Sequence, residues 1–475
     1  MANWLEQDWI IRAREQVGDI VDRGLDRNVK VAVTGLTRAG KTAFITSLVH
    51  QLLHGGAGQL PFFEVISSGR YQGSRQVRQP ELHVPDFPYN EALEGFREAP
   101  PHWPPSTRGL SEIRLSLKYR PGEGLLKKLS PVSHISIDII DYPGEWLLDL
   151  PLLDLSFADW SQQMWKLCQK SPRRNLMADW QDKFGQLDLL APCDEEQLAE
   201  VAESYTAFLH ACKAEGLSMI QPGRFVLPGE MAGAPMLKFC PLISHAGRPE
   251  MPAEIPAGSF LAVMQERYDY YRDHLVKGFY RDYFSKFDRQ IVLVDCLQAL
   301  NQGFACYEDM REAMTVILGS FQYGESSLLK RLFSPRIDKI LFAATKADHL
   351  PPSQHHRLQA FLDRMLQQAR NQIRYDGIQT DAMAIASIRA TEAVQAEHEG
   401  QSLACVRGLE FGSREPIVNF PGELPESALS REQWQSRKFN FVGFDLPEMG
   451  EQLNSGLPHI RMDKVLQYLL GDKLT

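Results

Sequence analysis

Residues 29–50 of the chain read VKVAVTGLTRAGKTAFITSLVH, and this stretch decides the fold. Within it, residues 35–42 fit the pattern G-x-x-x-x-G-K-[ST], with a β-type run before the pattern and an apolar helical pattern after it. Such a loop points backbone N–H groups and a helix N-terminus at one polyphosphate. In such a loop the lysine reaches the β- and γ-phosphate oxygens, and the following threonine offers its hydroxyl to Mg²⁺. We therefore predict nucleotide contacts from Gly35, Arg38, Ala39, Gly40, Lys41, Thr42 and Ala43, with Thr42 also a metal ligand.

The composition is that of an ordinary water-soluble protein. The chain has 475 residues, 44% hydrophobic and 23% charged, with a formal net charge of −9. This length predicts more than one structural unit, and the negative charge disfavours nonspecific binding of nucleic acid. Seven cysteines without C-x-x-C spacing indicate reduced thiols in the cytoplasm. No apolar run reaches the length of a membrane span.

Patterns along the chain predict an α/β fold. Alternating runs at 112–119 and 134–141 predict a hairpin, and apolar runs at 290–295, 338–344 and 382–386 predict parallel strands covered by helices on both faces. The proline-rich stretch 55–110 is expected to be a packed loop with one short helix near 89–98, and the tail 400–457 to be loop-rich before a last helix. We therefore predict a phosphate-loop NTPase fold with a GTPase-type, mostly parallel sheet and a large, mostly helical insertion. The predicted units are 1–28, an amphipathic helix packed on the core or, alternatively, on a membrane surface; 29–148, the first part of the G-domain; 149–288, the insertion; and 289–475, the second part of the G-domain with the C-terminal helix.

A second motif ends the predicted strand 134–140. Asp141-Tyr142-Pro143-Gly144 fits D-x-x-G. An aspartate at such a strand end can hold Mg²⁺ through water, and the glycine N–H can bind a γ-phosphate and report its loss. We predict Asp141 as a metal ligand and Gly144 as a catalytic group.

A third motif predicts the base. Thr345-Lys346-Ala347-Asp348 fits [NT]-K-x-D directly after a predicted strand, with threonine in place of the commoner asparagine. The Asp348 carboxylate can accept hydrogen bonds from guanine N1–H and N2–H₂, which adenine lacks. Ser387 and Ile388, after the next strand, are candidates for backbone contacts to the base. GTP and GDP, with Mg²⁺, are therefore the predicted ligands.

The order of these motifs resembles that of switch-type GTPases. The stretch TRGLSEIRL resembles the passage from switch I into the next strand in heterotrimeric G-protein alpha subunits. The resemblance makes Thr107 a candidate ligand of Mg²⁺ and the γ-phosphate. It makes Arg108 a candidate charge stabiliser in catalysis, although a solvent-facing role is equally open.

The chain also departs from these families. Small GTPases carry a catalytic glutamine after the D-x-x-G glycine, where this chain has Glu145. A carboxylate there repels a γ-phosphate, yet it can orient a water molecule. The helical insertion follows the D-x-x-G motif, whereas in the alpha subunits it precedes switch I.

Four blocks together resemble the YcjX-like family of phosphate-loop NTPases, a proteobacterial group of stress-inducible proteins. They are GLTRAGKT, PPSTRGLSEIRL, IDIIDYPGEWLLDLP and ATKADHL. The resemblance implies guanine-nucleotide binding, GTP hydrolysis, a cytosolic location and expression linked to stress. It leaves open an unknown protein partner, reached through the insertion or at the inner membrane.

Three functions remain open on the sequence. The first is a GTPase switch in which GTP orders Thr107 and Gly144. The second is an ATPase or phosphotransferase of the wider phosphate-loop class, which the T-K-x-D motif disfavours. The third is a nucleotide-binding scaffold with little turnover, which Glu145 keeps open.

Overall fold

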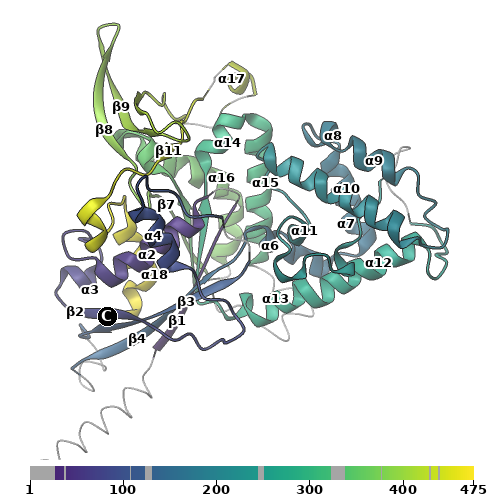
Figure 1. The fold of residues 1–475 in the computed structure, drawn as a ribbon, viewed down its shortest axis with the longest axis horizontal. Helices are drawn as coiled ribbons and strands as arrows, with labels where there is room; N and C mark the ends of the chain where they lie inside the picture. Colours follow the sequence, from purple (N-terminus) through teal and green to yellow (C-terminus); the bar gives the residue numbers. More distant parts are fainter. Residues whose placement is uncertain are drawn as a thin grey trace, which may run out of the picture.

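The centre of the fold is a seven-stranded, mostly parallel sheet (Figure 1). The computed structural model describes residues 27–36, 39–106, 109–122, 131–243, 251–321, 337–375, 377–426, 429, 431–436 and 439–475. The strand order is β2-β3-β4-β1-β5-β6-β7. The strands are β1 (Arg27–Gly35), β2 (Tyr71–Val77), β3 (Ser111–Tyr119), β4 (Ser133–Asp141), β5 (Arg289–Val294), β6 (Lys339–Ala344) and β7 (Gln379–Ala384).

Strand directions confirm the predicted fold class. Strands β4, β1, β5, β6 and β7 are parallel, and β3 runs antiparallel to both β2 and β4. The β3–β4 pair is the hairpin that the alternating runs predict. The central parallel strands β5 and β6 are almost entirely buried, as expected for a sheet with helices on both faces.

Helices cover the two faces of the sheet. On β1, Val31 and Val33 pack in one apolar cluster with Phe44, whereas Ala32 packs in a second cluster on the other face. The first cluster contains apolar side chains of α2 (Lys41–His54), α4 (Tyr89–Arg97) and α18 (Met462–Leu470). The second contains those of α14 (Cys296–Gln302), α15 (Phe304–Ser320) and α16 (His355–Tyr375).

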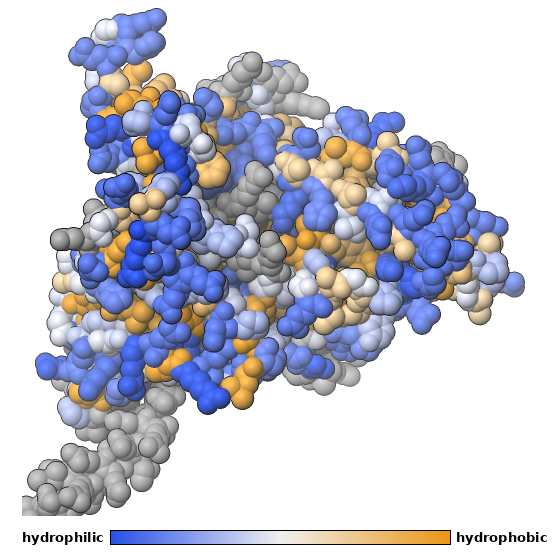
Figure 2. All heavy atoms as spheres, in the orientation of Figure 1, coloured by the Kyte–Doolittle hydropathy of each residue, from blue (hydrophilic) through white to orange (hydrophobic). Residues whose placement is uncertain are grey.

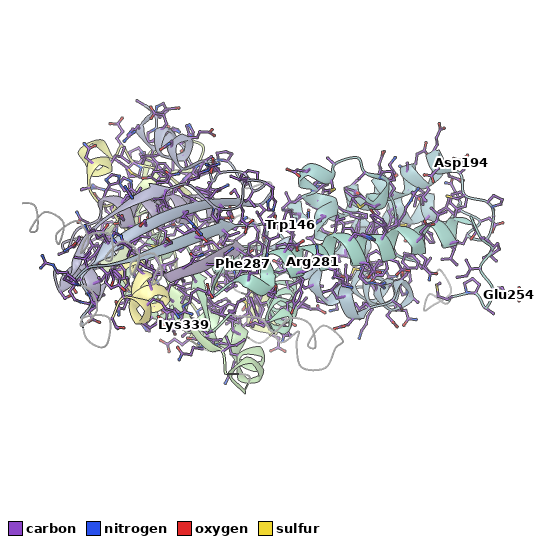
Figure 3. All side chains as sticks on the ribbon, turned by 90° about the horizontal axis from the view of Figure 1, so that it is seen from below. Trp146, Asp194, Glu254, Arg281, Phe287 and Lys339 are labelled. Atoms are coloured by element: carbon purple, nitrogen blue, oxygen red, sulfur yellow. The ribbon has the colours of Figure 1, made fainter. Side chains whose placement is uncertain are left out.

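The segment between β4 and β5 forms a helical lobe. Its helices are α6 (Glu145–Leu148), α7 (Phe157–Cys168), α8 (Arg173–Leu176), α9 (Ala178–Phe184), α10 (Glu195–Ala214), α11 (Gly223–Val226), α12 (Phe260–Tyr270) and α13 (Lys277–Asp282). Figure 3 shows the lobe extending away from the sheet, with Trp146 and Phe287 near the junction and Asp194 and Glu254 at the far end. The chain leaves the sheet after Asp141 and returns to it at Arg289.

Two expectations about loops are wrong. The stretch 55–110 contains the edge strand β2 and the one-turn helix α3 (Glu64–Ser67) besides the expected helix α4. The region 391–445 forms a second, four-stranded sheet from β8 (Thr391–His398), β9 (Gln401–Glu410), β10 (Pro416–Asn419) and β11 (Phe444–Asp445). Figure 1 shows β8 and β9 as a projecting hairpin. No residue of β2 is buried, and Thr391 is the single buried residue of β8, so their sequences lack the apolar alternation of a strand with one buried face.

Of the unit 1–28 predicted as an amphipathic helix, residues 1–26 lie outside the described residues, and Arg27 and Asn28 are the first residues of strand β1 instead. Among the helices that the structure does describe, none has the length and apolar character needed to cross a membrane. Figure 2 shows mainly hydrophilic side chains over the visible face of the helical lobe.

Candidate nucleotide-binding site

The three predicted motifs meet at one edge of the sheet. In the parallel register, Val33 pairs with Asp141, Gly35 pairs with Leu293, and Ala344 pairs with Ala384. The carboxyl ends of β1, β4, β5, β6 and β7 therefore lie level with one another. Ligands of open α/β sheets bind beyond this edge.

The phosphate loop turns sharply into helix α2. Gly40 is the N-cap of α2 with a φ of 80°, a left-handed conformation that glycine adopts without strain. A Cβ on Gly35 would lie 2.9 Å from the Leu293 Cβ, so this position is packed against β5. Ala39 and Ala43 are buried in the cluster beneath α2. Arg38 lies outside the described residues.

The D-x-x-G segment lies directly against the phosphate loop. A Cβ on Gly144 would lie 2.5 Å from the Gly35 carbonyl oxygen, so only glycine fits this contact without a shift. The Tyr142 N–H donates to the Val33 carbonyl over 3.3 Å. Gly144 is thus next to the loop that would hold the phosphates.

Groups suited to a metal ion lie in the same place. The Asp141 carboxylate is 1% exposed, and its Oδ1 lies 3.9 Å from Lys41 Nζ. The Thr42 hydroxyl donates to the Pro105 carbonyl over 3.1 Å. A hydroxyl and a carboxylate are hard oxygen donors that suit Mg²⁺, which commonly completes its shell with water and phosphate oxygens. Within the described ranges there is no cluster of three or more His, Cys, Asp and Glu side chains that would bind a metal unaided.

The switch I candidates Thr107 and Arg108 lie outside the described residues. The chain that follows them is described, and Ser111 at the start of β3 pairs with Asp141. The chain after the switch I candidates therefore enters the strand that pairs with the D-x-x-G aspartate.

The T-K-x-D loop is held in a defined geometry. The Thr345 N–H donates to the Val294 carbonyl over 3.0 Å, and Lys346 has a φ of 60°. Asp348 is 5% exposed, and its Oδ2 accepts the Ala390 N–H over 2.8 Å. That bond orients a buried carboxylate whose oxygens retain capacity for further donors.

The loop after β7 joins the base loop to helix α2. The Ala347 N–H donates to the Ile385 carbonyl over 2.9 Å, and the Ser47 hydroxyl of α2 donates to the Ser387 carbonyl over 2.5 Å. Ile388 is buried in the cluster that also contains the α2 side chains. Ser387 and Ile388 thus lie between the phosphate loop helix and Asp348.

Glu145 is buried and ion-paired with Lys213 of helix α10. Its Oε1 accepts from Lys213 Nζ over 2.6 Å, and the Glu145 side chain is 5% exposed. Burial acts to raise the pKa of Glu145, but the charges of Lys213 and Lys41 outweigh it and leave this pKa below its usual value. The carboxylate is therefore charged and held toward α10.

Sequence reasoning missed two partners of the motif residues. Asp295, at the end of β5, pairs with Lys346 over 2.5 Å, and Lys213 pairs with Glu145. Asp295 could have been found, because a carboxylate directly after a buried parallel strand lies at the ligand-binding edge. The sequence carries no comparable signal for Lys213.

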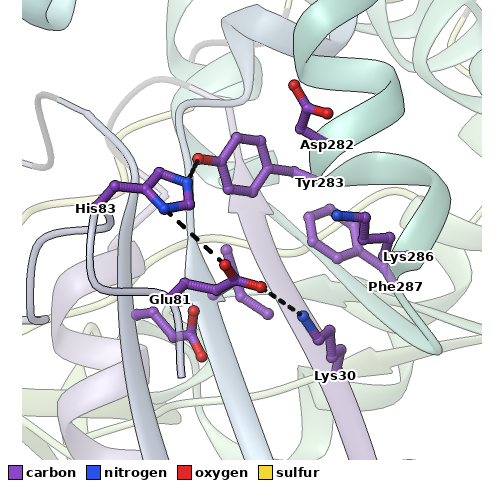
Figure 4. Close-up of a pocket in the computed structure, with 9 residues that line it drawn as sticks. Lys30, Glu81, His83, Asp282, Tyr283, Lys286 and Phe287 are labelled. Atoms are coloured by element: carbon purple, nitrogen blue, oxygen red, sulfur yellow. Dashed lines mark hydrogen bonds and ion pairs between the residues drawn. The ribbon is translucent and has the colours of Figure 1, made fainter. Parts of the chain in front are cut away.

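A cavity of about 320 Å³ lies elsewhere, between the sheet, the segment 81–83 and the end of the helical lobe (Figure 4). Lys30 Nζ lies 4.0 Å from Glu81 Oε1, and the Tyr283 hydroxyl oxygen lies 2.9 Å from His83 Nε2. Burial raises the pKa of Glu112, which also lines the cavity, to about 7. None of the described motif residues lines this cavity. The candidate nucleotide site is therefore defined by the loops at the sheet edge and not by this cavity.

Comparison with known proteins identifies the family. The sequence pattern of the YcjX-like family (DUF463) matches residues 29–474. The chain belongs to the YcjX-like family. The protein named Ras-like GTPase YcjX of Escherichia coli (strain K12) is 43% identical over 467 residues, covering 98% of this chain and 99% of that protein. The protein of the same name from Shewanella oneidensis MR-1 is 40% identical over 472 residues, covering 96% of each.

Proposed function

We propose that this chain binds GTP and GDP together with Mg²⁺ and hydrolyses GTP. The observation that carries the proposal is Asp348, a buried carboxylate oriented by Ala390 at the sheet edge that also bears the phosphate loop. The relatives named Ras-like GTPase, similar over nearly the whole chain, support the same activity.

Each described motif residue has a role in this proposal. Backbone N–H groups of the phosphate loop and Lys41 bind the β- and γ-phosphates, and the Gly144 N–H binds the γ-phosphate. Thr42 and Asp141 hold Mg²⁺, directly or through water, and the ion supplies positive charge that neutralises the phosphate oxygens. In hydrolysis, a water oxygen bonds to the γ-phosphorus while the bond from that phosphorus to the β–γ bridging oxygen breaks, giving GDP and phosphate.

Thr107, Arg108 and Glu145 complete the proposed catalytic set. Thr107 orders on the γ-phosphate and the metal, and Arg108 stabilises charge in the transition state. Glu145 replaces the water-orienting glutamine of small GTPases, and its ion pair with Lys213 holds it toward the lobe. We therefore propose slow intrinsic turnover.

The cellular role in this proposal is a stress-related switch. GTP would order Thr107 and Gly144, and the helical lobe behind Gly144 would pass that state to a protein partner. We propose a cytoplasmic location, including contact with the inner membrane surface, and no role in nucleic-acid binding. The ion pair of the buried Glu145 carboxylate with Lys213 favours one second candidate, a nucleotide-binding scaffold with little turnover.

The test is a titration of labelled GDP and GTP with Mg²⁺ against competing ATP, followed by phosphate release from the same sample. Guanine-selective binding with release supports the proposed GTPase. Guanine-selective binding without release supports the scaffold. Equal competition by ATP contradicts the proposed base recognition.

A further inference from the structure

The segment after Gly144 is embedded in the helical lobe. The Gln221 side chain donates to the Leu148 carbonyl over 2.5 Å, and the Gly223 N–H donates to both Asp149 carboxylate oxygens over 2.9 and 3.0 Å. The Arg224 guanidinium stacks 3.7 Å above the Trp146 ring. Helix α6 and Asp149 are therefore fixed to the rest of the lobe by several contacts that do not involve Lys213.

Lys213 differs from these contacts because it brings a positive charge next to the Glu145 carboxylate. It lies in the last turn of the twenty-residue helix α10, and its Nζ is 2.6 Å from Glu145 Oε1. The partial negative charge at a helix C-terminus favours a lysine there and disfavours a carboxylate. Lys213 thus offsets both the Glu145 charge and that of the α10 terminus.

The Glu145 charge lies close to where a γ-phosphate would bind. Glu145 follows Gly144, which contacts the phosphate loop, and the Lys41 ammonium interacts electrostatically with the Glu145 carboxylate. A carboxylate there repels a γ-phosphate far more than it affects GDP. That repulsion is strong at a site where burial limits screening by water.

We propose that Lys213 is a specificity-determining residue of the nucleotide site, supplied by the helical lobe. Its ammonium group compensates the negative charge of Glu145 and holds that carboxylate toward α10, away from the position of a γ-phosphate. The site can therefore accept a triphosphate beside Gly144. The inference rests on the proposed function, because it assumes that a guanine nucleotide binds at this edge.

The test measures GTP and GDP affinities, with Mg²⁺, of the full chain and its variants. We expect Lys213→Met to lower the ratio of GTP to GDP affinity by about tenfold or more, with GDP affinity changed by less than about threefold. Lys213→Arg, which keeps the charge, should retain most of the ratio. Glu145→Gln should raise the ratio, because the repulsive charge is removed while Lys213 remains.

The double variant Glu145→Gln with Lys213→Met separates charge from folding, because it removes both charges and leaves a neutral pair of similar size. We expect it to restore the wild-type ratio. The control is Lys183→Met, which breaks an exposed ion pair with Asp179 one turn away on helix α9 and should leave the ratio unchanged. Thermal melting of each variant shows whether it is folded.

Several results would overturn the inference. One is an equal loss of GTP and GDP affinity in Lys213→Met, which indicates a structural role. Others are an unchanged ratio in Lys213→Met and a double variant that stays as poor as Lys213→Met. Failure of the proposed function looks different, because the wild-type chain would then bind neither guanine nucleotide or would bind ATP equally well.

Discussion

Asp348 gives the sharpest test of base recognition. Its Oδ2 already accepts the Ala390 N–H over 2.8 Å, so the side chain is fixed before a nucleotide binds. Asparagine has a single acceptor oxygen, which would have to accept from both the Ala390 N–H and the base. Its NH₂ group would face a donor N–H group where the carboxylate had an acceptor oxygen. Each hydrogen bond to a charged group contributes about 1.5–3 kcal/mol. Loss of the two bonds to guanine should therefore weaken GDP binding by about 10²–10⁴-fold.

The same variant, Asp348→Asn, should gain affinity for xanthine nucleotides. Xanthine carries a carbonyl where guanine has its 2-amino group, so the amide of Asp348→Asn can donate to it. Competition of labelled GDP with GDP and XDP should show weaker GDP and stronger XDP binding in this variant. The matched control is Asp381→Asn in the adjacent strand β7, whose carboxylate accepts the Ala382 N–H, and it should change neither affinity. Unchanged GDP affinity in Asp348→Asn would refute the assignment of the base loop.

The other predictions concern the phosphates, the lobe and pH. Lys41→Ala should lower GTP affinity in a titration by about tenfold or more, since an ammonium contact to phosphate is lost; full affinity would contradict the phosphate loop. Gly144→Ala adds a Cβ 2.5 Å from a backbone oxygen, so it should cost about 1–3 kcal/mol in denaturant unfolding; an undiminished free energy of unfolding would disprove the close contact. Arg173→Met leaves the Asp309 carboxylate buried without its guanidinium, and should destabilise the chain by about 3–5 kcal/mol in the same assay; a loss below about 1 kcal/mol would count against this buried pair. Burial raises the pKa of Asp149 to about 7. The folded chain therefore retains a proton that the unfolded chain releases near pH 4, and stability should fall by up to about 1.4 kcal/mol per pH unit between about pH 4 and pH 7. Asp149→Asn should lack this contribution, and equal slopes for variant and wild type would contradict it.

The central sheet could be predicted because burial leaves a pattern in the sequence. Strands β5 and β6 are buried on both faces and appear as continuous apolar runs. Strand β8 has few buried residues and is held by pairing with β9. Its polar sequence resembles that of a loop, since backbone pairing requires no apolar side chain. The second sheet was missed for this reason.

The site could be predicted where a motif follows a strand end. Asp141 is the last residue of β4 and Thr345 follows β6, and both strands belong to the parallel part of the sheet, so the topology brings the two residues to the same edge. Lys213 is not at the end of a strand. It lies on a helix of the insertion and contacts Glu145 through tertiary packing. The spacing of residues 145 and 213 in the sequence gives no indication of the contact.

The position of the insertion in the chain decides which part of the site it can sense. The polypeptide passes from Asp141 through Gly144 directly into α6, and α6 is packed against α11 so closely that a Cβ on Gly223 would lie 2.2 Å from the Glu145 carbonyl oxygen. Such a contact leaves no room for α6 to slide over α11, because protein interiors transmit displacement rather than absorb it. If the γ-phosphate draws Gly144 toward the phosphate loop, α6 and α11 must move together. An insertion before switch I would lack this direct connection, since its chain would enter and leave the sheet ahead of the D-x-x-G segment. We therefore expect the lobe to move with Gly144, and we propose that Lys213 couples this movement to the charge of the bound nucleotide.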